Sequence, residues 1–133
     1  METQFNIIGA ILIILAFAHI IFPVYFNWKN DLMKLSLINR QMMKVHTIFI
    51  ALIVLLMGIL CLTSSKDLIE TDLGKTISLG LAFFWTIRLL IQFFGYSSLL
   101  WKGKKFETMV HIIFSLLWIY MSGVFWLNYF VEI

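Results

Sequence analysis

Four long runs of apolar residues, separated by short polar segments, dominate the pattern of this 133-residue chain. The runs cover residues 7–26, 42–62, 77–96 and 109–130. About 20 consecutive apolar residues are needed for a helix to cross the hydrocarbon core of a bilayer. The pattern therefore predicts an all-α protein, a single domain (residues 1–133) of four transmembrane helices packed as a bundle.

The first run is predicted to be a retained transmembrane helix and not a signal peptide. Glu2 is the only charged residue before it, so the basic region of a signal peptide is missing, and no small-residue cleavage site follows it. Pro23, the only proline in the chain, lies near the end of the run, where breaking a helix costs least.

The connections between the runs differ in pattern. After the first run, Leu32, Leu35 and Ile38 recur every three residues, which predicts one or two helical turns lying in the membrane interface, with Asn30 as the N-cap. The connection over residues 63–76 is polar and reads as a hairpin. The connection over residues 97–107 is short and basic.

Composition supports a membrane protein. Hydrophobic residues make up 62% of the chain and charged residues only 13%, against about 25% charged in an average soluble domain. So few polar side chains could not cover a surface that faces water, and the lipid bilayer is the expected partner. The net charge of +3 forms no basic stripe on a soluble element, so no nucleic acid is expected as a partner.

The basic residues of the connections predict the orientation in the membrane. The two connections after the first and third runs, with the adjoining helix ends, carry Lys29, Lys34, Arg40, Lys44, Lys102, Lys104 and Lys105, whereas the middle connection carries only Lys66 and Lys75. The positive-inside rule places the two basic connections in the cytoplasm. Both termini are then expected on the non-cytoplasmic side of the cell inner membrane.

Five polar side chains inside the runs are the candidates for function, because a polar group in lipid is costly without a partner. They are His19, His46, Arg88, Gln92 and His111. When the chain direction of each helix is taken into account, all five lie in the half nearest the two basic connections. The opposite half is expected to contain almost none.

The helical faces agree with one polar pocket. Trp85, Arg88 and Gln92 share one face of the third helix, and His111 and Trp118 share one face of the fourth. In a bundle these faces should turn inward. The sequence predicts a polar pocket in the cytoplasmic leaflet, lined by Arg88 and Gln92 and walled by Trp85 and Trp118.

The three histidines are candidate metal ligands. Imidazole is the commonest protein ligand of metals, and three histidines suit zinc, copper or iron. Alternatively, His46 and His111 lie at similar depth and are candidates for the axial ligands of haem b. The plainer interpretation is that His19, His46 and His111 hydrogen-bond to neighbouring helices and stabilise the bundle.

Arg88 is the most informative residue of the set. Arginine stays charged in proteins, and no Asp or Glu occurs within any of the four runs. Arg88 either pairs with Asp31 folded in from the first basic connection or faces an anionic ligand such as a haem propionate, a carboxylate or a phosphate. Gln92, one turn further along, is predicted to contact the same group.

Residues 39–46 (NRQMMKVH) and 84–94 (FWTIRLLIQFF) resemble small bacterial four-helix membrane proteins of uncharacterised function. The resemblance implies an Arg–Gln pair ahead of a histidine on the second helix and a Trp–Arg–Gln face on the third. It covers most of the chain and implies no activity.

The residues favour a membrane protein whose pocket binds haem or a metal ion, for redox chemistry or for action on a lipid-soluble substrate such as a quinone. A second hypothesis is a small transporter or channel, which would have to form a homo-oligomer to enclose a path and would lack the embedded acidic residue of small multidrug exporters. A third is an accessory subunit without chemistry, whose polar layer only fixes helix packing. Whether the protein is an enzyme is left open.

Overall fold

The computed structural model describes residues 1–100 and 102–131 and is all-α. Four of its helices are long and apolar enough to cross a membrane, namely α1 (Glu2–Tyr25), α3 (Leu37–Thr63), α5 (Asp72–Phe94) and α6 (Lys105–Phe130). Shorter turns connect them, namely α2 (Trp28–Asp31), the 3-10 turn η1 (Leu32–Lys34), α4 (Ser65–Glu70) and the 3-10 turn η2 (Ser98–Leu100). Each apolar run coincides with one long helix to within a few residues, so the all-α class and the four candidate spans are confirmed.

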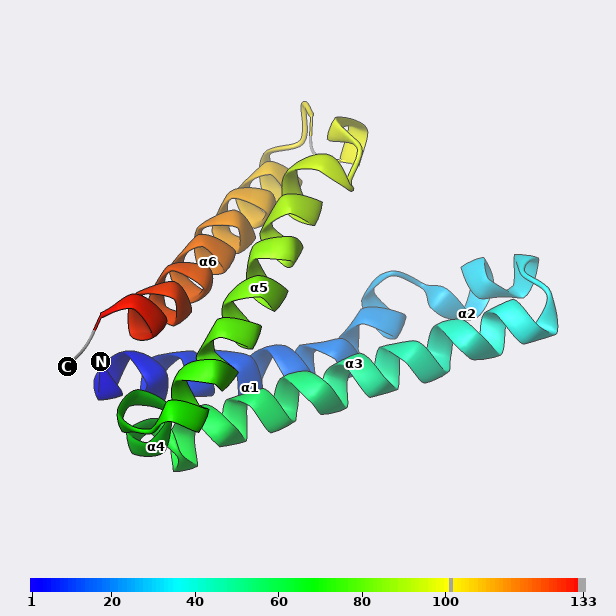
Figure 1. The fold of residues 1–133 in the computed structure, drawn as a ribbon. Helices are drawn as coiled ribbons and strands as arrows, with labels where there is room; N and C mark the ends of the chain where they lie inside the picture. Colours follow the sequence, from blue (N-terminus) through cyan, green and yellow to red (C-terminus); the bar gives the residue numbers. More distant parts are fainter. Residues whose placement is uncertain (101, 132–133) are drawn as a thin grey trace. The chain divides into compact units, whose positions relative to one another are not determined.

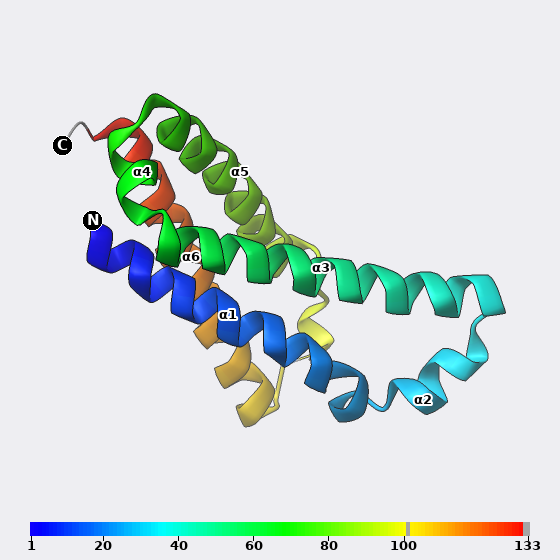
Figure 2. The same cartoon turned by 90° about the horizontal axis from the view of Figure 1, so that it is seen from below.

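The chain divides into two compact units, Glu2–Ser65 and the residues from Lys66 onward. In the first unit α1 packs against α3, and in the second α5 packs against α6 (Figure 1, Figure 2). Each unit is therefore a pair of long helices with short connecting turns. That all four helices form one domain stays a prediction.

Two glycines allow α1 and α3 to approach closely. A Cβ atom added at Gly58 would lie 2.9 Å from the carbonyl oxygen of Gly9, and one added at Gly9 would lie 2.9 Å from the carbonyl oxygen of Gly58. In lipid, close backbone approach strengthens the van der Waals packing that holds helices together. The larger residues Ile8 and Leu12 of α1 and Val54 of α3 are also buried.

Two short helical turns form the connection between α1 and α3, as the spacing of three predicted. Asn27 follows α1 and has left-handed backbone angles (φ 56°, ψ 48°), so the helix does not continue through it. The last turn of α1 also contains Pro23. The predicted N-cap at Asn30 is wrong, because Asn30 lies inside α2 and Asn27 precedes that helix. Ser36 caps α3, since its Oγ accepts a hydrogen bond from the backbone N–H of Asn39 (3.4 Å).

The polar connection over residues 63–76 holds α4 and the start of α5. The Thr71 side chain accepts a hydrogen bond from the Gly74 N–H (2.9 Å) and so caps α5. Gly74 is buried because α4 packs on this turn, and a Cβ atom there would overlap the carbonyl oxygen of Asp67. The connection predicted as a hairpin is thus a short helix, α4, that packs against the start of α5.

Aromatic residues dominate the contact between α5 and α6. Trp85 and Trp118 stack with their ring centroids 5.2 Å apart and their planes 12° apart. Further along, the Trp126 Nε1–H donates a hydrogen bond to the Thr86 hydroxyl (2.9 Å). Large apolar side chains such as Ile14, Phe94 and Leu116 lie exposed on the long helices, as expected of surfaces that face lipid.

Candidate functional site

The side chain of Arg88 lies near the last turns of α5 among neutral groups. Its Nη1 donates to the Gln92 side-chain oxygen (3.3 Å), and its Nη2 donates to the Tyr96 hydroxyl (3.5 Å). Its Cζ lies 5.1 Å from the ring centroid of Trp118 and 5.5 Å from that of Tyr96, both within the range of a cation–π contact. We call Arg88, Gln92, Tyr96, His111 and Trp118 the Arg88 cluster.

Gln92 links Arg88 to α6. Its amide nitrogen lies 2.9 Å from Nδ1 of His111. Arginine only donates hydrogen bonds, so the amide oxygen of Gln92 must face Arg88 and the amide nitrogen must face His111. The nitrogen donates, so Nδ1 of His111 accepts, and a neutral His111 carries its proton on Nε2. Arg88, Gln92 and His111 therefore form one ordered chain of hydrogen bonds across the helix pair.

Two buried indole N–H groups near Arg88, Gln92 and His111 have no hydrogen-bond partner among the described residues. Trp85 and Trp118 are 2% and 3% exposed. In the part of the chain that the structure describes, neither Nε1 has a partner, nor has the buried hydroxyl oxygen of Ser122. Buried donors of this kind cost free energy. Trp85 and Trp118 stack on each other, and Trp118 also contacts Arg88, whereas the polar pocket that these two residues were predicted to wall stays a prediction.

Arg88 forms no ion pair with a carboxylate in the described part of its own unit. Its two hydrogen bonds leave other guanidinium N–H donors without an acceptor there, because a guanidinium carries five. Asp31, the partner weighed from the sequence, belongs to the other unit, so that pairing stays a prediction. Arg88 is thus surrounded by neutral groups in its own helix pair.

The other two histidines belong to the α1–α3 unit. Nδ1 of His19 lies 2.8 Å from the carbonyl oxygen of Leu15, and Nδ1 of His46 lies 2.8 Å from that of Met42. A carbonyl only accepts, so both rings carry the proton on Nδ1 and have their lone pair on Nε2. That is the reverse of the tautomer in His111.

The metal site predicted from the sequence uses His19, His46 and His111 together as ligands. Among residues 1–100 and 102–131, no group of three or more His, Cys, Asp and Glu side chains is placed to hold a metal ion. His19 and His46 lie in one unit and His111 in the other. The assignment of a metal or haem to His19, His46 and His111 stays a prediction.

The sequence interpretation missed a second polar cluster, at the opposite end of α5 and α6. Asn128 is fully buried and its Nδ2 donates to the carbonyl oxygen of Leu68 (2.9 Å) and to the hydroxyl of Ser78 (2.6 Å). Lys75 Nζ donates to the carbonyl oxygens of Asn128 and of Val131, the latter at 3.0 Å. The expectation that this half holds almost no polar groups is therefore wrong. The polar Asn128 within an otherwise apolar run could have indicated this cluster.

Tyr96 was also missed as a member of the Arg88 cluster. It follows the end of α5, where an aromatic residue reads as an interface anchor. Because Tyr96 lies beyond the end of α5, helical spacing from Arg88 does not identify it, and the contact depends on how the chain leaves the helix.

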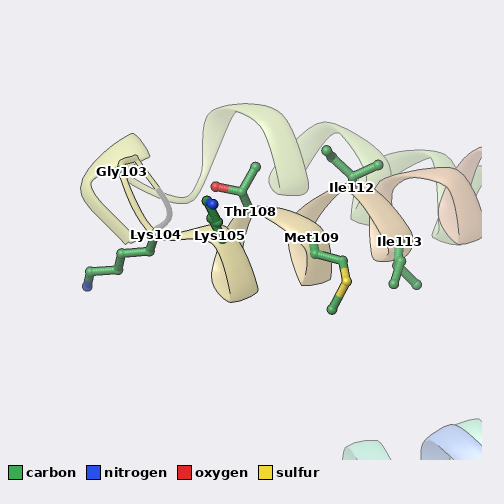
Figure 3. A pocket seen from close by; sticks show the side chains of 7 residues that line it. All are labelled: Gly103, Lys104, Lys105, Thr108, Met109, Ile112 and Ile113. Atoms are coloured by element: carbon green, nitrogen blue, oxygen red, sulfur yellow. The ribbon is translucent and has the colours of Figure 1, made fainter.

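Two cavities lie outside the Arg88 cluster. One, of about 550 Å³, runs along the start of α6 between Gly103 and Ile113. Figure 3 shows its two lysines, Lys104 and Lys105, at the beginning of the helix and the apolar Ile112 and Ile113 further along. The other, of about 1050 Å³, lies in the α1–α3 unit and includes His19.

No protein-family model, curated protein or solved structure matches this chain. The four long apolar helices agree with a small four-helix membrane protein. The resemblance to a particular bacterial group stays a prediction.

Proposed function

We propose that this chain is an integral membrane protein that binds a lipid-soluble carboxylate at the Arg88 cluster. The single observation that carries the proposal is the cation of Arg88, placed on an apolar helix among neutral partners. Gln92, Tyr96 and Trp118 orient the guanidinium without neutralising it. The binding of an anion supplies the missing charge.

The cost of a charge in hydrocarbon supports this proposal. By insertion scales an arginine at the centre of a membrane helix costs at least about 2.5 kcal/mol, and Arg88, in the second half of α5, bears a part of that cost. Neutral acceptors reduce that cost only in part, whereas a carboxylate forms two parallel charge-assisted hydrogen bonds with a guanidinium. A quinone carbonyl would meet the same donors but would leave the charge uncompensated, so the carboxylate is the favoured ligand.

The surroundings of Arg88 favour entry from the lipid. Phe84 and Ile91, four residues before and three residues after Arg88, lie on neighbouring positions of α5 and are 45% and 44% exposed. A ligand with an acyl or other apolar tail could lie along these side chains while its carboxylate reaches Arg88. By the positive-inside rule, this end of the helix pair belongs to the cytoplasmic leaflet of the inner membrane.

Within this proposal, His111 and Gln92 are positioning residues. His111 holds the amide of Gln92, and the amide oxygen of Gln92 holds one edge of the guanidinium. Trp118 supports the guanidinium from α6. Trp85 stacks on Trp118 and keeps its ring in place.

The test is the binding of a fatty acid brominated along its chain to the purified full-length protein in detergent. Bromine quenches tryptophan fluorescence, and Trp118 lies against Arg88, so binding at the cluster is read directly. We expect Arg88→Gln to weaken binding roughly tenfold or more, and Arg88→Lys to weaken it less, because lysine keeps the charge but loses the bidentate geometry.

Two controls accompany this test. Lys66→Gln removes an exposed charge of α4 outside the cluster and should leave binding unchanged. The brominated methyl ester, which lacks the anionic charge, should bind weakly to every variant. Equal affinity of the wild-type protein and Arg88→Gln for the brominated acid would contradict the proposal.

A second candidate function rests on the tautomers of His19 and His46. Both rings donate Nδ1–H to a backbone carbonyl, which is the arrangement that orients a metal-binding histidine and directs the Nε2 lone pair outward. We propose these two residues as ligands of haem b or a transition metal ion, which would supply redox chemistry when bound. His111 fits this role less well, because its Nδ1 accepts from Gln92 and a neutral ring carries a proton on Nε2.

Elemental analysis and an absorption spectrum of gently purified protein test the second candidate. Near-stoichiometric iron, copper or zinc that is lost in His46→Ala and kept in His111→Ala would support ligation by His46. Loss of the metal from the His111 variant alone, or protein free of metal and chromophore, would contradict the assignment.

A further inference from the structure

The larger cavity is a groove within the α1–α3 unit, with a volume of about 1050 Å³. We call it the α1–α3 groove. Its lining includes three cations, Lys29, Arg40 and Lys44, and no Asp or Glu. It also includes apolar side chains from both long helices, among them Ile20 and Ile48. The groove belongs to the unit that does not contain the Arg88 cluster.

The cations lie at one end of the groove, beside the connection between the long helices, and apolar side chains of α1 and α3 continue from there along the groove. Lys29 lies in α2, and Arg40 and Lys44 lie in the first turns of α3, so all three are near the connection between the long helices. Ala51 lies 11 residues after Arg40 in the same helix, which is roughly 16 Å at 1.5 Å per residue. The groove therefore changes from cationic to apolar along the direction in which α3 would enter the membrane.

The positive charge of the groove is uncompensated in the described residues. Arg40 Nη1 donates to the sulfur of Met33 (3.4 Å), which is a weak acceptor. Lys29 and Lys44 are exposed, and neither forms an ion pair in residues 1–100 and 102–131. Asp31, the nearest acidic residue along the chain, does not line the groove.

The apolar side chains of the groove are open to their surroundings. Ile20, Val24 and Ile48 are 68%, 83% and 67% exposed, although each lines the groove. A soluble anion would gain nothing from these side chains. An acyl chain of the surrounding bilayer could lie along them while remaining attached to a head group at the cations.

We infer that the α1–α3 groove binds an anionic phospholipid of the surrounding bilayer. The phosphate lies at Lys29, Arg40 and Lys44, and an acyl chain lies along Ile20, Val24 and Ile48. Attraction of anionic lipid to basic side chains beside a membrane helix supplies the affinity for the head group, and the groove supplies the selection of one lipid molecule.

The test is native mass spectrometry of the full-length protein released from nanodiscs that contain equal amounts of phosphatidylglycerol and phosphatidylcholine with the same acyl chains. We expect one retained phosphatidylglycerol on the wild-type protein. The double variant Arg40→Gln, Lys44→Gln should reduce its retention roughly tenfold or more, because each cation near an anionic lipid contributes severalfold to binding.

The matched control is Lys34→Gln, Lys66→Gln, which removes the same charge from exposed residues that do not line the groove. This control should retain phosphatidylglycerol as the wild-type protein does. Equal loss in both double variants would overturn the inference, because the cations would then attract anionic lipid only through the overall positive charge of the protein. Equal retention of both lipids by the wild-type protein would overturn it as well.

Glycerol phosphate separates a bound lipid from a bound soluble phosphate. If the head group alone, added to detergent-purified protein, binds as tightly as phosphatidylglycerol, the groove takes a soluble phosphate and the inference of a lipid is wrong. Circular dichroism of each variant shows whether its helices are intact, and Ile48→Asn, which leaves all three cations in place, should also weaken retention of the lipid.

Discussion

At the scale of single residues, Arg88 differs from every other cation of the chain. The remaining Lys and Arg residues lie in connections or near helix ends, where water or head groups can solvate them. Arg88 instead relies on an amide, a phenol and an indole ring. A residue held in this way either only packs the helix pair or binds an anion, and substitutions at Gln92 distinguish the two roles.

Gln92→Glu should stabilise the protein and weaken ligand binding. The new carboxylate would lie where the amide oxygen now accepts from Arg88 at 3.3 Å, and would neutralise the guanidinium internally. We expect a higher melting temperature in detergent, together with a loss of brominated fatty-acid binding of roughly tenfold or more. Gln92→Leu is the control, since it should lower the melting temperature. Unchanged binding in Gln92→Glu would indicate that Arg88 only packs the helices.

At the scale of secondary-structure elements, each helix pair uses a different means of packing. The α1–α3 pair relies on two glycines that let the backbones touch. The α5–α6 pair relies on stacked indoles and on polar clusters toward both ends. Substitutions in the two pairs should therefore act through different physical causes.

Gly58→Ala should lower the free energy of unfolding by about 1–3 kcal/mol, the usual cost of overpacking. The added methyl group would lie 2.9 Å from the Gly9 carbonyl oxygen, a backbone atom of the facing helix. Chemical denaturation in mixed micelles measures the effect. Gly80→Ala is the matched control, because a Cβ atom there meets nothing within 4 Å and a neutral or slightly stabilising change is expected.

Lys75→Met should loosen the last turn of α6. The ammonium group of Lys75 donates to two carbonyl oxygens at the C-terminal end of that helix, where a positive charge also interacts favourably with the helix dipole. Loss of about 1 kcal/mol should speed hydrogen exchange of the amides of residues 127–131 roughly fivefold. The same exchange rates in Lys66→Met, which alters an exposed lysine of α4, should not change. Equal rates in both variants would contradict this capping role.

At the scale of the whole molecule, the distribution of lysine and arginine predicts the orientation of the four spans. The connections after α1 and α5 are basic, whereas the connection that holds α4 is nearly balanced. The same asymmetry predicts that the Arg88 cluster and the cationic end of the α1–α3 groove each lie toward the cytoplasm. Whether the protein also forms a homo-oligomer stays a prediction.

Accessibility of single cysteines tests this orientation. The chain has one cysteine, the buried Cys61, so Cys61→Ser gives a background without thiols. In intact cells a membrane-impermeant maleimide should label Lys66→Cys and should not label Lys34→Cys or Lys104→Cys. Permeabilised cells should show labelling of all three. Labelling of Lys34→Cys from outside the cell would reverse the predicted topology.

The sequence by itself determined the four long apolar helices, the polar positions around Arg88 in α5 and α6, and the basic character of two connections. These follow from composition and from helical periodicity, which depend only on neighbours along the chain. The sequence also indicated Trp85, Arg88, Gln92, His111 and Trp118 as one group, and the structure brings these five together in one helix pair.

The tertiary structure alone decided which polar atoms meet. Gln92 determines which ring nitrogen of His111 carries the proton, and the carbonyl of Leu15 does so for His19. These opposite tautomers cannot be predicted from the positions of the histidines in the sequence. The contact of Lys75 with the end of α6, more than 50 residues later, likewise depends on how two helices pack. A hydrogen bond requires its two atoms to lie within about 3 Å, and that distance is set by side-chain packing between helices, which periodicity along one helix does not specify.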